Sequence, residues 1–402
     1  MRATTLALRS GALILAAALF MAGCGGDANL REPAPVPDVE DPQFRVQSVW
    51  SHRVGRGTEG DYLRLRVVAE DDRIYAAARN GRVVAREADS GKRVWSRDTG
   101  AGITGALGHG EDKLLLGTER GQVMALDRTD GSVLWRAQVS SEVLAPPAEN
   151  RGVVAVHTGD GKLFGLEADS GAQRWIYDRS VPVLTLRATS RPQAVDTHFV
   201  DGFASGRLIA ADARTGELAW ESTIAVPRGR SEIERMVDIA SAPVIRDDHA
   251  YVAAFQGRVV ALELATGQVG WNREISSFSG LDVSDDAVYV VDERDRLWAL
   301  DRESGSTLWR QEALRDRRLS APTVHGDHLL LADGQGHFYV LHREDGRVVA
   351  RHRLRAEPPV DGTGLKPRRD RRVLNAPLVV DDRVVVIDRD GYLQSLRLRR
   401  RD

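Results

Sequence analysis

Residues that could perform chemistry are sparse in this chain of 402 residues and form no catalytic pattern. Four of its ten histidines are close in sequence, but they fall across separate strands and turns: His325, His328, His337 and His342. We interpret them as surface and turn histidines, since a metal site needs several ligands at one point. Acidic residues mostly belong to repeated turns, and we find no nucleophile paired with a base. The sequence therefore predicts no catalytic residue, no metal and no cofactor.

The single cysteine, Cys24, stands where its chemistry can be predicted. Residues 1–23 begin with the positive Arg2 and Arg9 and continue in an apolar run that is too short to span a membrane. The run ends in Met21-Ala22-Gly23-Cys24, which resembles a bacterial lipobox, where the cysteine is acylated and becomes the first residue. We predict a lipoprotein signal peptide over 1–23 and lipid attachment at Cys24. An ordinary secretory signal is the alternative.

The next segment, residues 24–43, reads as a flexible tether after the lipidated cysteine. It is rich in proline and acids and poor in apolar side chains, so it cannot bury a core. Its residues 25–43 would reach about 60 Å if fully extended. Gly25, and not an aspartate, follows the cysteine, which among lipoproteins implies passage to the outer membrane. The net charge of −2 argues against a nucleic-acid partner, which would require a basic excess.

One repeat runs through the remainder of the chain. Each copy has a glycine, an alternating apolar strand, an acid, a turn glycine and then an aromatic residue, as in Gly81, Glu87, Gly91 and Trp95. The tryptophan recurs in the following copies at Trp135, Trp175, Trp220, Trp271 and Trp309. A seventh copy carries His342 in place of the acid and Ala350 in place of the tryptophan. This fixed spacing indicates a repeat architecture.

Each copy supplies four short strands, and the count of strands predicts the fold. In the second copy these strands are 103–108, 113–118, 122–127 and 133–139, with period-two alternation and glycine turns between them. Such repeats of about 40 residues are typical of β-propellers. After the seventh copy, three more strands end the chain, and a segment around Trp50 has the pattern of the missing fourth. We predict an all-β, eight-bladed propeller over 44–402, closed by its N-terminal strand.

The repeated residues have an architectural interpretation. The turn glycine permits a positive φ in the outer hairpin, and the acid can accept hydrogen bonds from the same turn. Each tryptophan is expected to pack between neighbouring blades. Residues 210–220 and 261–271 resemble the tryptophan-docking repeat of PQQ-type quinoprotein propellers, a resemblance that covers most of residues 46–398.

That resemblance implies the fold and leaves the chemistry open. A PQQ-dependent enzyme of the family would be expected to have a calcium site and a disulfide ring near the quinone. Cys24 alone cannot form a disulfide within the chain. A periplasmic ligand-binding propeller is the other alternative, and it would have a polar central funnel. We therefore interpret the chain as a binding scaffold and not an enzyme.

The repeat is interrupted at two consecutive places. The spacing of the turn glycines rises to 45 residues between Gly171 and Gly216 and to 51 between Gly216 and Gly267. Both insertions, 180–190 and 227–240, follow an outer strand and precede the next inner strand. They should therefore emerge side by side on one face of the ring, where function is expected in a propeller. The alternative is that they are long loops with their leucines tucked under the ring.

The composition of the two insertions favours protein docking, because apolar anchors stand beside arginine and acids. With the lipobox, the tether and eight repeats, the stretches 184–187 and 231–238 resemble the BamB family, lipoproteins of the outer-membrane β-barrel assembly machinery. Ala240 stands where that family often has a second acid. The residues that correspond to the family's docking stretches are Leu184, Leu186, Arg187, Arg235 and Asp238.

The resemblance implies a non-catalytic scaffold on the periplasmic face of the outer membrane. Its implied partners are the POTRA domains of BamA and other members of the BAM complex, with unfolded outer-membrane proteins as further partners. We expect such a scaffold to support the folding and insertion of β-barrel proteins by positioning its partners.

Overall fold

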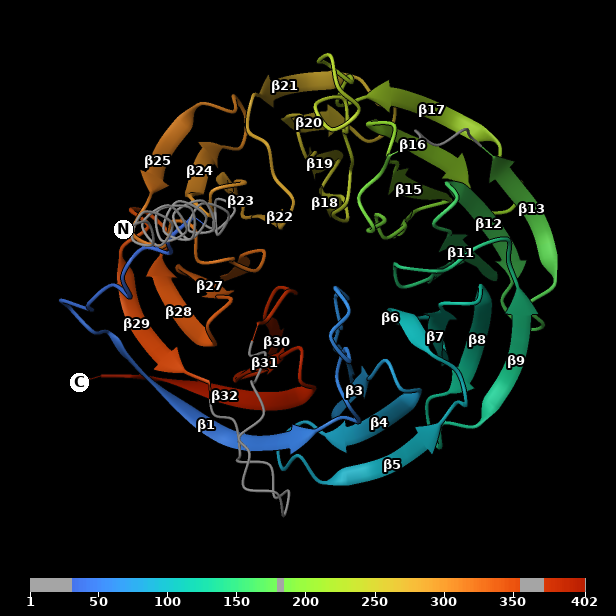
Figure 1. The fold of residues 1–402 in the computed structure, drawn as a ribbon, viewed down its shortest axis with the longest axis horizontal. Helices are drawn as coiled ribbons and strands as arrows, with labels where there is room; N and C mark the ends of the chain where they lie inside the picture. The colour runs from blue at the N-terminus through green and yellow to red at the C-terminus, as the bar shows by residue number, and fades with distance from the viewer. Residues whose placement is uncertain (1–30, 179–183, 355–371, 402) are drawn as a thin grey trace, which may run out of the picture. The chain divides into compact units, whose positions relative to one another are not determined.

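Eight four-stranded antiparallel sheets form a ring in the computed structural model, which describes residues 31–178, 184–354 and 372–401. The sheets are arranged as blades around a common centre (Figure 1). This architecture confirms the predicted eight-bladed propeller. The described residues contain no helix of the length and hydropathy needed to cross a bilayer.

The first four blades follow the chain in order, each from its inner to its outer strand. Blade 1 contains β2 (Val68–Glu70), β3 (Arg73–Ala77), β4 (Arg82–Glu87) and β5 (Arg93–Asp98). Blade 2 contains β6 (Ile103–His109), β7 (Lys113–Thr118), β8 (Gln122–Asp127) and β9 (Val133–Gln138). Blade 3 contains β10 (Ala148–Asn150), β11 (Val153–His157), β12 (Lys162–Glu167) and β13 (Gln173–Asp178). Blade 4 contains β14 (Gln193–Val195), β15 (His198–Gly202), β16 (Arg207–Asp212) and β17 (Leu218–Thr223).

The last four blades complete the ring. Blade 5 contains β18 (Val244–Arg246), β19 (His249–Ala253), β20 (Val259–Glu263) and β21 (Val269–Arg273). Blade 6 contains β22 (Gly280–Val283), β23 (Ala287–Val291), β24 (Leu297–Asp301) and β25 (Thr307–Gln311). Blade 7 contains β26 (Thr323–His325), β27 (His328–Ala332), β28 (His337–His342) and β29 (Val348–Arg353). Blade 8 contains β30 (Leu378–Val380), β31 (Arg383–Ile387), β32 (Tyr392–Arg400) and β1 (Phe44–Arg53).

Blade 8 joins the two ends of the chain, as the sequence predicted. Its outer strand β1 pairs antiparallel with β32 from Phe44 opposite Arg400 to Arg53 opposite Tyr392. A register shift beside Trp50 matches the shift beside the tryptophan in the other outer strands, for example at Trp95. The N-terminal strand therefore supplies the fourth strand of the last blade and closes the ring (Figure 1).

The apolar core is divided among the contacts between blades. The middle strands are buried along their whole length, as in β7 and β11, because both of their faces pack against neighbouring blades. One apolar cluster lies between each pair of adjacent blades, eight in all among the described residues. Stability is thus spread over repeated contacts between neighbours.

All seven repeat tryptophans make the same contact with the following blade. The indole Nε1 donates to the carbonyl of the residue after the repeat acid, or after His342 in blade 7, over 2.7–3.0 Å. The indole also lies against the turn glycine, since a Cβ on Gly91 would approach the ring of Trp50 to 2.6 Å. The pairs are Trp50 with Ala88, Trp95 with Arg128, Trp135 with Ala168, Trp175 with Ala213, Trp220 with Leu264, Trp271 with Arg302 and Trp309 with Arg343.

The absence of a tryptophan at Ala350 has a structural reason. In blade 8 the third strand, β32, and the fourth, β1, come from opposite ends of the chain, so no outer hairpin joins them. A tryptophan in blade 7 would therefore meet neither a turn glycine nor a turn carbonyl. Ala350 is 2% exposed and packs in a cluster that includes Leu396 and, at its edge, Phe44.

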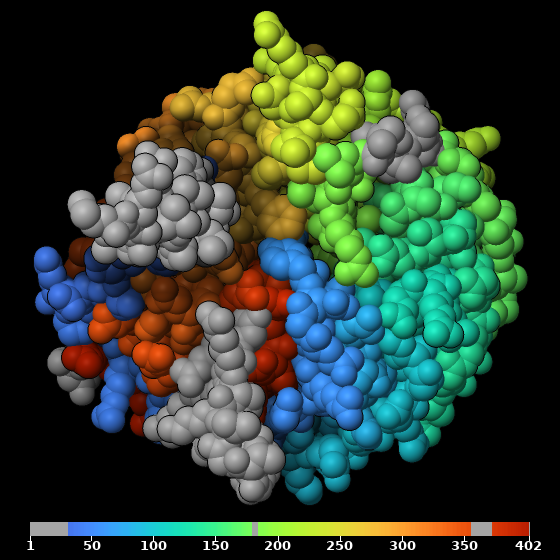
Figure 2. Space-filling model, viewed as in Figure 1, coloured from blue at the N-terminus to red at the C-terminus, as the bar shows by residue number. Residues whose placement is uncertain are grey.

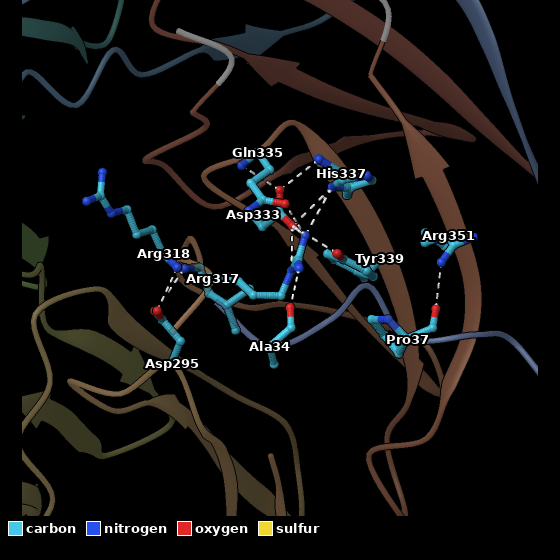
Figure 3. Close-up of polar contacts among 11 residues, drawn as sticks. Ala34, Pro37, Asp295, Arg317, Arg318, Asp333, Gln335, His337, Tyr339 and Arg351 are labelled. Atoms are coloured by element: carbon cyan, nitrogen blue, oxygen red, sulfur yellow. Dashed lines mark hydrogen bonds and ion pairs between the residues drawn. The ribbon is translucent and has the colours of Figure 1, made fainter. Parts of the chain in front are cut away.

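The second half of the predicted tether, residues 34–43, lies against the ring. The carbonyl of Ala34 accepts a hydrogen bond from Nη1 of Arg317 at 2.6 Å, and the carbonyl of Pro37 accepts one from Nη1 of Arg351 at 2.7 Å (Figure 3). Gln43 N–H donates to the carbonyl of Val349 at 2.9 Å, which extends these contacts along blade 7. Residues 34–43 of the predicted tether are therefore held against the ring.

A buried polar cluster holds the Arg317 side chain in position for this contact. Its Nη2 donates to the Asp333 carboxylate at 2.7 Å and to Gln335 at 2.8 Å, while Tyr339 donates to the same carboxylate at 2.8 Å (Figure 3). Backbone carbonyls in a proline-rich extended segment have no internal partners, so they are free to accept from such donors. The composition of the segment 34–43 therefore gave no indication of this ordered contact.

Candidate functional site

Two insertions and one segment near the centre of the ring make up the candidate site. Loop A, residues 184–192, precedes blade 4, and loop B, residues 224–243, joins blades 4 and 5. Together with the central segment, residues 58–67, they lie on the face shown in Figure 2, with the blue central segment beside the light-green loop A. Residues 180–183 of the predicted first insertion lie outside the described residues.

Loop A presents an apolar side chain and a charge close together. Leu184 is 39% exposed, which is high for a leucine. Leu186 is half-buried and lines a cavity of ≈ 110 Å³. The exposed Arg187 donates from Nη2 to the Glu142 carboxylate of the connection between blades 2 and 3, at 2.7 Å. This exposed pair is screened by solvent, so it positions Arg187 with little effect on stability.

The tip of loop B is a self-capped turn. The carboxylate of Glu234 accepts N–H bonds from Arg230 at 2.7 Å and Ser231 at 3.2 Å, and Ser231 Oγ accepts from the N–H of Glu234 at 3.2 Å. These reciprocal bonds form a capping box, and the backbone N–H groups hold the pKa of Glu234 below its usual value. The turn presents Ile233, at 67% the most exposed of the large apolar side chains among the described residues. Arg235 beside it is also exposed.

The base of loop B is anchored in the ring. Phe255 N–H donates to the carbonyl of Asp238 at 2.8 Å, in an isolated bridge between the loop and blade 5. The flanking Val237 and Ile239 are buried in the apolar cluster between blades 4 and 5. Loop B therefore has a fixed base and an exposed tip.

Asp238 lies beside both loops. Its side chain is 1% exposed, so it does not face solvent. The backbone N–H groups of Leu186 in loop A and of Ile239 in its own loop oppose the rise of its pKa, while its Oδ2 has no hydrogen-bond partner among the described residues. Asp238 also lies with Leu186 in the wall of the small cavity. Asp238 is thus buried beside both loops, a position that its acidic type alone did not reveal.

The surroundings of Asp238 are polar and enclosed. His157 Nδ1 lies 2.8 Å from the carboxylate of Asp201, and both side chains are buried. Burial raises the pKa of Asp238 to about 7, against the opposing effects of His157, Arg64 and the two backbone donors. A carboxylate in such a site resists ionisation because water is withdrawn from its charged form.

The central segment was not anticipated by the sequence analysis. From it, Arg64 reaches across the ring and donates to the carbonyls of Ala240 in loop B at 2.9 Å and Phe278 at 2.6 Å. Its guanidinium also lies 4.3 Å from the centroid of the Phe278 ring. Ala240, where the resembled family often has a second acid, is buried here and offers its carbonyl to Arg64. No repeat pattern covers this segment, so its position depends on tertiary contacts alone.

The predicted docking residues thus fall into two groups. Leu184, Arg187 and Arg235 are exposed on one face, whereas Leu186 is half-buried and Asp238 is enclosed. Ile233 joins the exposed group as its most prominent apolar member. The lipidation site Cys24 lies outside the described residues.

The histidines are arranged differently from the surface and turn positions expected for them. His325 is opposite His328 on the neighbouring strand, and His328 is opposite His342 on the next, so three of them form a row across blade 7. His337 is buried in the cluster of Arg317. Among residues 31–178, 184–354 and 372–401, no group of three or more metal-ligating side chains is placed to hold an ion.

The fold and the repeated tryptophan contact define a PQQ-like eight-bladed propeller. The chain matches the family described as outer membrane protein assembly factor BamB over residues 47–113, 79–311 and 299–400. A curated relative of that name from Alkalilimnicola ehrlichii is 43% identical over 97% of this chain and 97% of its own length. The chain therefore belongs to the BamB family.

Solved structures agree with this assignment. The crystal structure of BamB from Moraxella catarrhalis has a TM-score of 0.78 and 26% identity, covering 88% of this chain and all of that one. Quinohemoprotein alcohol dehydrogenase from Comamonas testosteroni, at 13% identity and a TM-score of 0.66 over 88% of this chain and 76% of its own, shares the fold alone. The curated relatives are named as assembly factors, so this propeller is a non-catalytic member of a fold that also hosts enzymes.

The described residues do not suit a quinone cofactor with calcium. A single cysteine cannot supply a vicinal disulfide. The carboxylate that lines the central cavity is already occupied, since Asp282 accepts from the N–H groups of Val283 and Val324, at 2.9 and 2.8 Å. The PQQ-enzyme alternative therefore has no support in this site.

Proposed function

We propose that the chain is a lipid-anchored periplasmic scaffold of the BAM complex that docks onto the POTRA domains of BamA. Loop A and the tip of loop B form its docking surface. In this position it would support the folding and insertion of β-barrel proteins, with unfolded outer-membrane proteins and other complex members as further partners. Membership of the BamB family and the geometry of the loops both support this proposal.

One observation carries the proposal: at the two insertions into the repeat, exposed apolar side chains and arginines are held in a fixed arrangement. Leu184 and Ile233 are well exposed, and each stands near an arginine, Arg187 or Arg235. Apolar anchors with arginine are typical of interface hot spots. Because Asp238 and the capping box already order the two loops, little conformational entropy would be lost on binding.

We assign different roles to the residues of this surface. Leu184, Leu186, Arg187 and Arg235 would touch the partner, with Ile233 as a further apolar anchor. Asp238 is buried, so it would act as a positioning residue that sets the distance between the loops.

The anchoring of the ring follows from the docked segment 34–43. With the lipid on Cys24, the free tether would comprise residues 25–33, which reach about 30 Å when fully extended. This is roughly half of what the whole tether would allow. The contacts of Ala34 and Pro37 would thus keep the propeller closer to the outer membrane.

Affinity capture from solubilised outer membranes tests the proposal. The variant Leu186→Ala with Arg187→Glu removes an apolar contact and reverses a charge in loop A. We expect wild type to capture the POTRA-bearing barrel protein and the variant to lose most of it. Equal thermal unfolding of the two proteins would show that the fold is intact.

A matched control uses the outer strand of blade 6. Leu308→Ala with Arg310→Glu makes the same changes two residues apart, at a leucine that is 53% exposed. This control should capture as much partner as wild type. If nothing is captured by wild type, or if the control loses as much as the loop variant, the docking proposal is wrong.

A further inference from the structure

The opening of the ring contains a cavity of ≈ 640 Å³ with an unusual charge distribution. Among its lining residues, three arginines face one carboxylic acid: Arg64, Arg66, Arg191 and Asp282. This local positive excess contrasts with the net charge of −2 of the whole chain. The cavity adjoins the small cavity under loop A, with which it shares Leu144 and Thr189 as lining residues.

Two of these four charged groups are already satisfied. Arg64 donates to the carbonyls of Ala240 and Phe278. Asp282 accepts from two backbone N–H groups, and burial raises its pKa, so its negative charge is disfavoured. Neither group therefore needs a ligand.

Arg66 and Arg191 have no such compensation. Nη1 of Arg66 is buried, and within the described ranges it finds no hydrogen-bond partner. Arg191 donates from Nη2 to the Gln193 amide oxygen at 3.2 Å, and in the same part of the chain it makes no ion pair with a carboxylate. A buried cationic group without a partner is costly, and such groups are normally paired.

The electrostatics of the pair agree with the geometry. Burial lowers the pKa of Arg66. Burial, and after it the positive charge of Arg66, lowers the pKa of Arg191 to about 9, against the opposing charge of Asp201. The two guanidinium groups thus repel each other from positions on the same cavity wall. An anion between them would reverse that repulsion.

Much of the remaining wall is apolar and repeated. Ala-Pro pairs precede the inner strands of four blades and line the cavity: Ala145–Pro146, Ala242–Pro243, Ala321–Pro322 and Ala376–Pro377. Such a wall suits the apolar body of a small molecule, with its polar group held by a few placed side chains.

We propose that the central cavity is a binding site for a small molecule with an oxyanion group, phosphate or carboxylate, which Arg66 and Arg191 hold. Both anions present paired oxygens that match the planar fork of a guanidinium. Arg191 belongs to loop A, but neither it nor Arg66 is among the residues assigned to the docking surface, so the site adds a ligand to the scaffold.

Thermal unfolding of the full-length protein in detergent tests this site. Wild type is heated with inorganic phosphate, with benzoate, or with chloride at the same ionic strength. We expect at least one oxyanion to raise the melting temperature in a saturable manner, since a ligand that binds only the folded state stabilises it. A response to phosphate alone or to benzoate alone would identify the head group.

Variants locate the binding. Arg66→Gln with Arg191→Gln should weaken oxyanion binding at least about tenfold, while Arg120→Gln, at an exposed arginine, should bind as wild type does. Without oxyanion the double variant should melt no lower than wild type, because it removes two uncompensated charges. A stabilisation equal to that of chloride, or one that persists in the double variant, would overturn the proposal.

Discussion

The outer rim of the propeller and the face that carries loops A and B follow opposite rules. On the rim the same contact recurs seven times, with an indole donating to a turn carbonyl in the next blade. On the loop face, single residues such as Asp238 and Arg64 contact segments that are distant in sequence, and these side-chain contacts belong to no repeat.

The difference shows how a repeat protein separates stability from binding. Each rim contact stabilises one interface between neighbours, and the ring sums them. The loop face carries the exposed side chains of loops A and B. Buried polar groups beneath these loops fix the positions of the exposed side chains. Changes on the rim should therefore affect unfolding, and changes at the loop tips should affect binding.

The largest expected effect comes from removing a rim contact. Trp175→Ala deletes a side chain that is 7% exposed and its bond to the carbonyl of Ala213 at 3.0 Å. Truncating a buried tryptophan costs about 3–5 kcal/mol. Urea unfolding should show this loss, whereas Leu308→Ala on the exposed side of an outer strand should cost less than about 0.5 kcal/mol. Similar costs for the two variants would contradict a rim locked by its tryptophans.

The next effect should be smaller, and it comes from adding a tryptophan to the one blade that lacks the tryptophan contact. Ala350→Trp restores the repeat residue where the next blade has no outer hairpin. We expect overpacking to destabilise the protein by about 1–3 kcal/mol, measured by the same unfolding curves. A gain in stability would show that blade 8 can receive an indole after all.

On the loop face, Asp238→Asn should change how stability depends on pH. The folded-state pKa of Asp238, about 7, lies above the value of 3.8 for an exposed aspartate, so the folded protein binds the proton more tightly. Its contribution to stability is therefore full below pH 4 and declines as the pH rises to about 7. Asparagine has nearly the same size and cannot ionise.

The difference between the two proteins is the quantity to measure. Between pH 5 and pH 8, the free energy of unfolding of the variant should rise relative to that of wild type by about 1–3 kcal/mol, since each pKa unit corresponds to about 1.4 kcal/mol. The midpoints of urea unfolding at pH 5 and pH 8 measure this difference. Asp130→Asn serves as the exposed control. A difference that does not depend on pH would mean that Asp238 is ionised throughout.

The smallest effect on stability is expected at the tip of loop B. Ile233→Ala should change unfolding by less than about 0.5 kcal/mol, because most of the side chain is in solvent. Calorimetric titration with the POTRA repeats should nevertheless show weaker binding. Unchanged binding would remove Ile233 from the docking surface.

The sequence predicted the ring well because period, strand count and turn glycines are local signals. The closing strand around Trp50 could be assigned because one strand was missing at the other end. The burial of Asp238, the reach of Arg64 and the docking of Ala34 on Arg317 could not, since each joins segments far apart in the chain. The exposed loop residues could be identified because they interrupt the repeat. The buried residues that support them follow no sequence pattern.

Photo-crosslinking in intact cells tests the central claim most directly. A photoreactive residue is placed at Leu184, at Ile233 or, as a control, at Leu308, which are all exposed in the isolated chain. The docking account predicts crosslinks to the POTRA-bearing barrel protein from Leu184 and Ile233 and none from Leu308. Crosslinks from Leu308 alone, or equal crosslinks from all three positions, would contradict it.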